Sequence, residues 1–316
     1  MAHTGSDNRP DETSPFIQEE AVTQPDAQYY YGLVYASGSG KELNYEKAAQ
    51  FFRLAADQGH IEAQCGLGSL YADGLGVTPN DAEAVRWFRM AAEAGSADAQ
   101  FYLASMYRHG RGVDEDISET VSWLLKAADQ EHAEAQCQLG MMHFIGDGVT
   151  QNEAEAIRLF TLAGERGQAE AQAVLGAAYG EGIGVPVDYE ASVRWYTLAA
   201  DQGNCEAQCG LGIMYLIGRG VAKNEKEGAQ WFRKAATNGL ADAQLSLGVL
   251  YMNGSGVPLD YLESYAWIAI ADRQGLPGAD TIKEDILTRV GESRRAGAEQ
   301  RAVKYWEQYV VPFQNS

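Results

Sequence analysis

Small and apolar residues recur along the chain with helical spacing, inside a longer period. An Ala is followed by a large apolar residue four positions on and by an aromatic residue four positions later, as at Ala63, Leu67 and Tyr71. Side chains four positions apart lie on one face of an α-helix. A second run, with Trp87 and Ala91 four apart, predicts a second amphipathic helix. Each period therefore predicts a helical hairpin.

The hairpin pattern occurs seven times at a constant spacing. Its first Ala recurs every 36 residues, at Ala27, Ala63, Ala99, Ala135, Ala171, Ala207 and Ala243. An acidic residue precedes each of these alanines and a Gln follows each. A constant period of this length indicates a solenoid, and one hairpin cannot bury its apolar face without its neighbours. We predict an all-α, right-handed α/α superhelix of seven 36-residue helix-turn-helix repeats.

Glycines occupy constant positions within the repeat. A glycine in the middle of the first helix is replaced only once, by Ala104. It costs about 1 kcal/mol of helix propensity, so we expect two helix backbones to approach closely there. A glycine pair follows, as at Gly74 and Gly76. Its first member is expected to end the helix in a left-handed conformation, and its second to permit the turn.

The two ends of the chain lack the pattern. Residues 1–25 are polar, contain three prolines and show no period, so we predict a disordered segment. Residues 26–277 hold the seven repeats. Residues 278–316 lose the glycine pair, but 281–290 and 293–309 still have the pattern of amphipathic helices. We predict that they are capping helices that close the core, the alternative being a separate binding helix.

Charge and composition narrow the choice of partner. The chain has 24 basic and 44 acidic residues, a net charge of −20. Nucleic acids and anionic membranes bind basic surfaces, so neither is expected as a partner. A basic protein segment is favoured instead. No stretch is long and apolar enough to predict a membrane span.

The cysteines and the N-terminal residues indicate the cellular compartment of the protein. The four cysteines are Cys65, Cys137, Cys205 and Cys209. All but Cys205 lie at the same repeat position, and equivalent positions are spread along a solenoid, so we expect four free thiols. Free thiols are typical of a reducing compartment. The N-terminus also lacks the basic and apolar regions of a secretory signal. We expect a cytoplasmic protein, with signal-independent export or a processed precursor as open alternatives.

The repeat pattern resembles a known family. The consensus D/E-A-Q-x3-L-G-x2-Y-x2-G-x-G-V, followed by A-x2-W-F-x2-A-A-x2-G, is similar to the Sel-1-like repeat, a relative of the tetratricopeptide repeat. This resemblance implies an α/α superhelix and an adaptor role in protein complexes. Some cysteine-rich members of the family have been linked to penicillin binding or β-lactam hydrolysis. Those members staple each repeat with paired cysteines, which this chain lacks.

No catalytic, cofactor or metal site is predicted. The segment 38–41 departs from a phosphate loop, because Tyr35 stands where its first Gly should be and Glu42 follows Lys41 in place of Ser or Thr. The five histidines lack metal-ligand spacing. We therefore expect a non-enzymatic, monomeric scaffold that binds a protein or peptide. The alternatives are an exported effector that acts on a host and a hydrolase related to the cysteine-rich members.

The candidate binding surface lies on the first helices of the repeats. By analogy with tetratricopeptide repeats, the exposed positions are −1, 2, 6, 9 and 10 relative to the repeat Ala. They are mixed in repeats 1–3, apolar in repeats 4, 6 and 7, and small in repeat 5, where they include Ala173, Ala177 and Gly180. The candidate residues are Tyr29, Phe101, Arg108, Met141, Phe144, Ile145, Ile213, Leu216, Ile217 and Met252.

Two interpretations of these positions remain open. Exposed Met, Phe and Ile side chains favour a groove for an apolar helix or an extended peptide. The alternative is that these residues belong to the core. The acid at position −1 has two interpretations as well: it complements the helix dipole, or it forms a row of negative charge that attracts a basic peptide.

Overall fold

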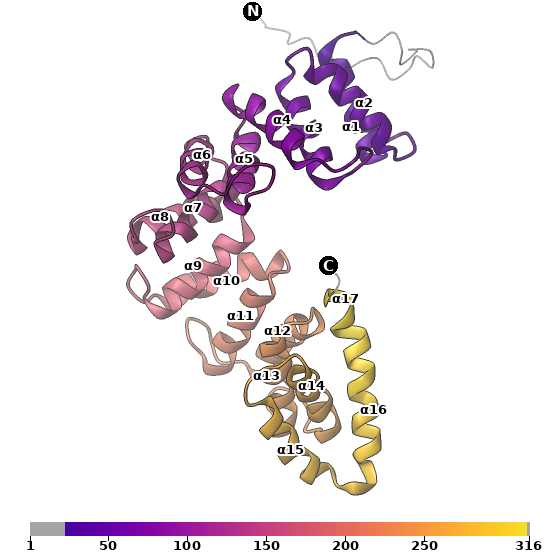
Figure 1. The fold of residues 1–316 in the computed structure, drawn as a ribbon. Helices are drawn as coiled ribbons and strands as arrows, with labels where there is room; N and C mark the ends of the chain where they lie inside the picture. Colours follow the sequence, from indigo (N-terminus) through magenta and orange to yellow (C-terminus); the bar gives the residue numbers. More distant parts are fainter. Residues whose placement is uncertain (1–22, 315–316) are drawn as a thin grey trace, which may run out of the picture. The chain divides into compact units, whose positions relative to one another are not determined.

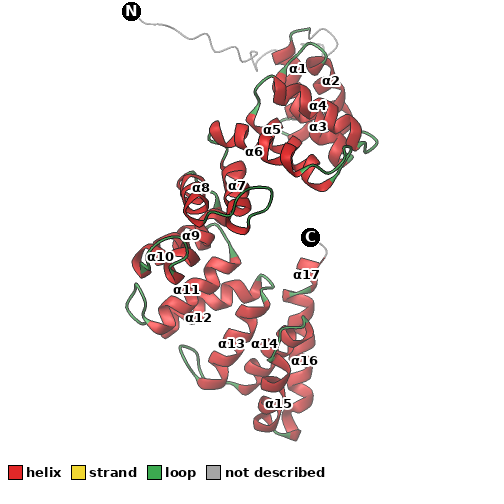
Figure 2. Cartoon of the chain, turned by 60° about the vertical axis from the view of Figure 1, so that its left-hand side comes forward, coloured by secondary structure: helices red, strands yellow, loops and turns green. Residues whose placement is uncertain are grey.

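The computed structural model describes residues 23–314, and these contain helices and no strand (Figures 1 and 2). The first helices of the repeats are α1 (Pro25–Ser37), α3 (Ile61–Asp73), α5 (Ala97–His109), α7 (Ala133–Ile145), α9 (Ala169–Glu181), α11 (Cys205–Ile217) and α13 (Ala241–Asn253). The second helices are α2 (Tyr45–Ala56), α4 (Asp81–Glu93), α6 (Ile117–Asp129), α8 (Glu153–Glu165), α10 (Tyr189–Asp201), α12 (Glu225–Thr237) and α14 (Tyr261–Arg273). The all-α architecture of paired helices is confirmed.

The chain divides into two compact units. Among the described residues, unit 1 contains those up to Leu139 together with Asp147–Thr150, and unit 2 contains Gly140–Gly146 and the chain from Gln151 onward. Helix α7 therefore contributes its first half to unit 1 and its last residues to unit 2.

The predicted N-terminal segment, residues 1–25, is described by the structure only from residue 23 onward. Residues 1–22 of the segment predicted to be disordered lie outside the described residues. Helix α1 begins at Pro25, which is inside that predicted segment. Proline suits the first helical position because the missing N–H has no intrahelical partner there.

Polar side chains cap the N-termini of both the first and the second helices of the repeats. An Asn or Asp precedes every second helix and accepts a hydrogen bond from a backbone N–H of its first turn; these caps are Asn44, Asn80, Asp116, Asn152, Asp188, Asn224 and Asp260. Before several first helices the cap is another polar residue, such as Ser96 or Asn204, which accepts from the N–H of the repeat Ala. Such caps are worth about 1 kcal/mol each.

The glycine pair behaves as predicted at its first member. Gly74 ends α3 with φ of 68° and donates its N–H to the Leu70 carbonyl. The second member, Gly76, also has φ of 68°, and a Cβ there would lie 2.1 Å from the backbone carbon of Tyr45. The second glycine thus lets the loop touch the start of the preceding repeat's second helix, which packs the repeats together.

Our prediction for the mid-helix glycine was wrong. We expected two backbones to meet there, but a Cβ at Gly68 would lie 2.8 Å from the Phe88 ring, and one at Gly176 would lie 2.5 Å from the Tyr196 ring. The glycine makes room for a large side chain of the second helix. Equivalent contacts occur at Gly32, Gly140, Gly212 and Gly248.

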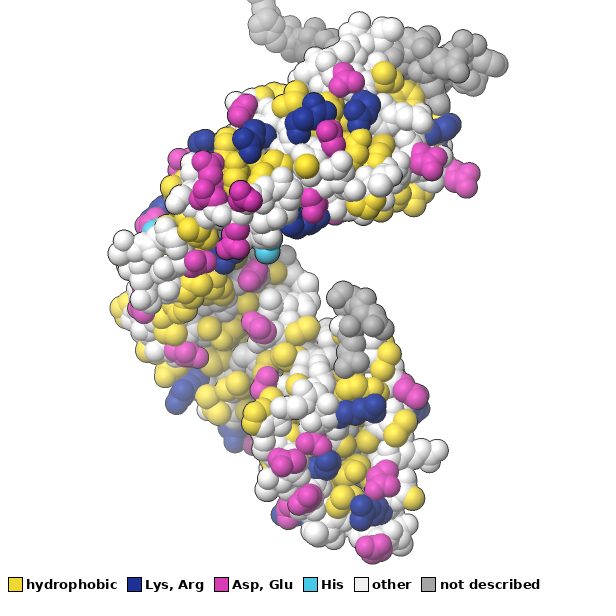
Figure 3. Space-filling model, in the orientation of Figure 1, with side chains coloured by type: hydrophobic (Ala, Val, Ile, Leu, Met, Phe, Trp, Pro, Cys, Tyr) yellow, Lys and Arg dark blue, Asp and Glu magenta, His cyan; other side chains and the backbone are white. Residues whose placement is uncertain are grey.

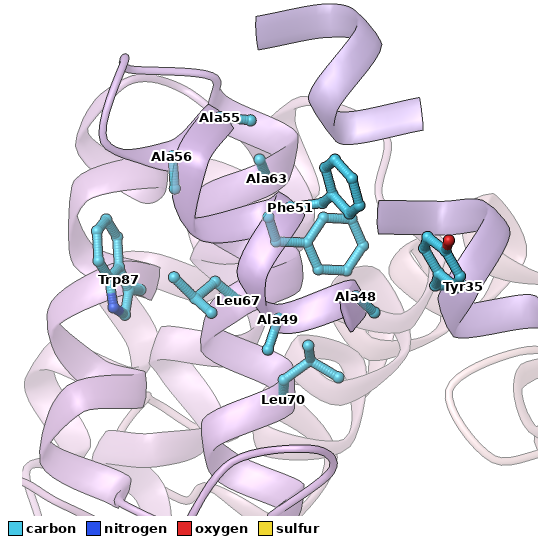
Figure 4. Packing of buried hydrophobic residues seen from close by; sticks show 11 residues of the cluster. Tyr35, Ala48, Ala49, Phe51, Ala55, Ala56, Ala63, Leu67, Leu70 and Trp87 are labelled. Atoms are coloured by element: carbon cyan, nitrogen blue, oxygen red, sulfur yellow. The ribbon is translucent and has the colours of Figure 1, made fainter. Parts of the chain in front are cut away.

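Core clusters extend across neighbouring hairpins within each unit. Leu67 and Trp87, from α3 and α4, lie in one cluster with residues of the first repeat (Figure 4). The Gln after each repeat Ala is buried, and from the second repeat onward it donates to a carbonyl at the end of the preceding second helix, as Gln172 does to Gly164 at 2.8 Å. This bond satisfies an orphan carbonyl and so joins consecutive hairpins.

Three further helices follow the repeats in unit 2: α15 (Ala279–Val290), α16 (Glu292–Tyr309) and α17 (Val311–Gln314). Figure 1 shows α16 alongside α14. Tyr309 stacks on Trp267 with ring centroids 5.2 Å apart, and Val310 is only 2% exposed. Arg301 and Tyr305 both hydrogen-bond to Glu263. These contacts cover hydrophobic side chains of the last repeat that would otherwise be exposed to solvent.

Candidate functional site

The positions expected to face a partner differ in exposure. Position 10 is exposed in every repeat, whereas position 9 is half-buried throughout. Position 2 corrects the expectation, because it is nowhere exposed and is buried at Cys65, Cys137 and Ala173. Position 2 points toward the next hairpin, so its side chains fill the space between repeats. The available surface is therefore narrower than the sequence suggested.

Three of the predicted residues are large, apolar and exposed. The exposed fraction is 57% for Ile145, 48% for Ile213 and 50% for Ile217. Ile145 is the last residue of α7, Ile213 and Ile217 lie on α11, and all three belong to unit 2. Figure 3 shows hydrophobic side chains gathered in the region of α9 to α11, with acidic side chains among them. We call this surface the apolar face, made of Met141, Phe144, Ile145, Ala177, Ile213 and Ile217.

A cavity of about 240 Å³ adjoins the apolar face. It is lined by residues of five consecutive helices and one loop of unit 2: Met141, Phe144, Ile157, Ala173, Val174, Ala177, Ala178, Ile183, Tyr196 and Glu206. Met141 and Phe144 are thus brought together with repeat 5.

The small residues of α9 create this cavity. Positions 6 and 9 hold Met141 and Phe144 in repeat 4, and Ile213 and Leu216 in repeat 6. In repeat 5, position 6 holds Ala177, whose small side chain lines the cavity, and position 9 holds Gly180, where an added Cβ would lie 3.0 Å from Ser192 Oγ. Cores normally contain few voids larger than a water molecule, so a cavity of this size is a distinct feature of the face.

Electrostatics at the cavity are set by acids and a tyrosine. Glu206 lines the cavity and is exposed, as is Glu181 at the end of α9. Burial, together with Glu181, Cys209 and Glu206, raises the pKa of Tyr196 to about 12. The tyrosine hydroxyl therefore stays protonated at neutral pH and can act as a hydrogen-bond donor.

Leu216 and Met252 behave as packing residues. Both are half-buried: Leu216 packs against the cluster around Phe232, and Met252 packs against the cluster around Ile268. The core interpretation describes these two better than the groove interpretation does. Met252 thereby extends the core toward α15.

Tyr29 and Phe101 each stack on a histidine of unit 1. The ring centroids of Tyr29 and His60 are 4.6 Å apart, and those of Phe101 and His132 are 4.9 Å apart. Nδ1 of each histidine accepts the backbone N–H of the next repeat Ala, so His60 and His132 cap the helices that follow. The two aromatic residues therefore hold neighbouring hairpins together.

Arg108 is committed to an ion pair. Its Nη2 lies 2.8 Å from Asp147 Oδ2, and both side chains are about one-third exposed. It ties α5 to the loop after α7, and both residues belong to unit 1.

The acids at position −1 lie in the first turns of their helices and are exposed in all seven repeats: Asp26, Glu62, Asp98, Glu134, Glu170, Glu206 and Asp242. Their position complements the helix dipole. Two pairs of these acids also flank His60 and His132, and Asp98 Oδ1 lies 3.2 Å from His132 Nε2. Helix stabilisation and a row of negative charge are both compatible with this geometry.

Other kinds of site find little support in the described part of the chain. Residues 23–314 contain no group of three or more His, Cys, Asp or Glu side chains able to hold a metal ion. Within the same residues no helix has the length and apolar character needed to cross a membrane.

The sequence identified half of the cavity and missed the rest. Met141 and Phe144 were candidates, Ala173 and Ala177 were noted as small residues of repeat 5, and Glu206 was one of the acids at position −1. Ile157, Ile183 and Tyr196 were not included. One clue was available: Tyr196 is the only tyrosine at a position that holds Phe52, Phe88, Phe160 and Phe232 in other repeats. The other two come from a second helix, which holds Ile157, and a loop, which holds Ile183.

Comparison with known proteins gives a consistent result. The model of the Sel1 repeat matches residues 25–60, 61–96, 97–132, 133–168, 169–204, 205–240 and 241–275, which confirms the resemblance. A Sel1 repeat protein from Oxalobacter formigenes is 33% identical, with a TM-score of 0.67, over 83% of this chain and 76% of that one. A protective antigen of uropathogenic Escherichia coli strains is 29% identical, with a TM-score of 0.60, over 92% of this chain and 70% of that one. No curated protein matches the chain.

Proposed function

Because the chain belongs to the Sel1 repeat family, we propose that it is a scaffold that binds an apolar segment of another protein on the apolar face of unit 2. Repeat solenoids present extended surfaces of this kind to their partners. The scaffold contributes a surface and no reacting group, so we propose no catalytic role for it.

One observation carries this proposal. Ile145, Ile213 and Ile217 are each about half exposed, in a chain of net charge −20. Exposed apolar residues that gather on one surface mark interaction sites more often than scattered ones do. Burying one such side chain against a partner is worth roughly 1.5–3 kcal/mol at most. Three of them, on the first helices of repeats 4 and 6, can therefore supply a useful part of a binding energy.

Replacing exposed residues tests the proposal without disturbing the core. We expect the double variant Ile213→Glu/Ile217→Glu to keep the helicity and thermal stability of the parent, because both side chains are about half exposed. The amount of partner protein that it captures should fall on the order of tenfold or more, because two charges would be buried against an apolar segment. Affinity capture with quantitative mass spectrometry measures the loss.

Leu198→Glu provides a matched control. Leu198 is 49% exposed and lies in the same unit, but on the second helix α10. The control should capture the same proteins as the parent. If the double variant retains every protein that the control retains, the apolar face is not the binding site and the proposal is wrong.

A further inference from the structure

We propose that the cavity beside the apolar face holds one aromatic or large aliphatic side chain of the partner, and that a Lys or Arg adjoins this residue in the partner's sequence. This inference rests on the function proposed above and adds the chemistry of the bound segment.

The size and lining of the cavity suit one large apolar side chain. An apolar protein cavity of about 150 Å³ accommodates benzene, and this cavity measures about 240 Å³. Met141, Phe144 and Ile157 supply apolar walls, and Ala173 and Ala177 supply its floor on α9. Buried anchors of this kind contribute most of the binding energy at protein interfaces.

The charges around the cavity select the neighbour of the anchor. Glu206 lines the cavity, and Glu181 lies near enough to act electrostatically on Tyr196 beside it. The residues that line the cavity include no Lys or Arg. A partner carboxylate next to the anchor would be repelled, whereas a Lys or Arg would meet an acid on the rim. Rim charges of this kind act mainly on selectivity and association rate.

Tyr196 adds a polar group to an apolar site. No hydrogen bond to its hydroxyl is found within residues 23–314, although the side chain is half-buried. The equivalent residue is Phe in four other repeats, so the hydroxyl serves no purpose in the repeat itself. It is available to donate to a backbone carbonyl of the bound segment.

The test uses a display library of random 12-residue peptides as the probe and the full chain as the immobilised target. Enriched peptides are expected to share Phe, Trp, Leu or Met within two residues of a Lys or Arg. Synthetic versions are then titrated against variants by fluorescence anisotropy.

Ala177→Leu fills the cavity and should weaken peptide binding on the order of tenfold or more, as expected for the loss of an anchor site. Its thermal stability should be equal to or above that of the parent, because the added side chain occupies empty space. Ser105→Leu makes the same kind of change at the same position of repeat 3, and it should bind as the parent does.

Glu206→Gln should weaken binding about threefold and reduce its salt dependence, as expected for an exposed ion pair. Glu190→Gln removes an equal charge from the first turn of α10 and should change neither. Unchanged binding by both Ala177→Leu and Glu206→Gln would overturn the inference.

The outcomes separate the two proposals. If the peptides lack the pattern but still depend on Ile213 and Ile217, the cavity inference is wrong and the proposed function stands. If they bind independently of those residues, the proposed function is wrong as well. Binding seen only after deletion of residues 1–22 would assign the cavity to this chain's own N-terminal segment. Self-association that Ala177→Leu abolishes would assign it to a second copy. Either result would overturn the inference.

Discussion

At the scale of single residues, complementary sizes determine how each hairpin closes. Where the first helix has a glycine, the second helix has a larger group against it, such as Phe88 against Gly68. Repeat 3 is the exception on the first helix, where it has Ala104, with Leu124 at the position of Phe88, and both are fully buried. Repeat 7 keeps the glycine, Gly248, against the aliphatic Ile268. The exception indicates that the pair, and not the glycine alone, is what the fold requires.

A double-mutant cycle tests this pairing. In the parent chain, Gly68→Ala should lower the free energy of unfolding, because overpacking typically costs about 1–3 kcal/mol and the gain in helix propensity is only about 1 kcal/mol. In a Phe88→Leu background the same change should be neutral or stabilising, since it recreates the pair found in repeat 3. Urea denaturation of the four chains measures the difference. An identical effect of Gly68→Ala in both backgrounds would show that the ring is not the obstacle.

At the scale of elements, the sequence predicted what depends on local periodicity. The helices, their left-handed glycine ends and the two long C-terminal helices follow from spacing within one segment. The purpose of the Gly68 position did not follow, because it depends on which side chain another helix places there. The same is true of the cavity, where Tyr196 and Ile183 join residues from two other repeats only after stacking.

The cap formed by α16 makes a prediction at this scale. Val310→Asp would place a carboxylate at a site that is 2% exposed, at a cost of several kcal/mol, and should detach α16 from α14. Amide hydrogen exchange should then accelerate in α14, which loses the stacking of Tyr309 on Trp267.

The adjacent residue provides the control for this change. Val311 is 38% exposed, so Val311→Asp should leave exchange in α14 as in the parent. Equal exchange in α14 for both variants would mean that α16 does not protect the last repeat.

At the scale of the molecule, repetition builds the scaffold and departures from it build the site. In unit 1 the predicted binding residues are used internally, as Arg108 is in its ion pair with Asp147 and Phe101 is in its stack on His132. In unit 2, Ile145, Ile213 and Ile217 are exposed, and Ala177 lines the cavity. The candidate surface is therefore confined to one unit, which a sequence pattern common to all seven repeats does not reveal.

Site-specific photo-cross-linking tests the central claim most directly. A photoreactive phenylalanine analogue is placed at position 213 on the apolar face, or at position 198 on α10, and each full chain is irradiated with a bound, selected peptide. The account predicts a covalent peptide adduct from position 213 and none from position 198. Adducts of equal yield from both positions, or from position 198 alone, would contradict it.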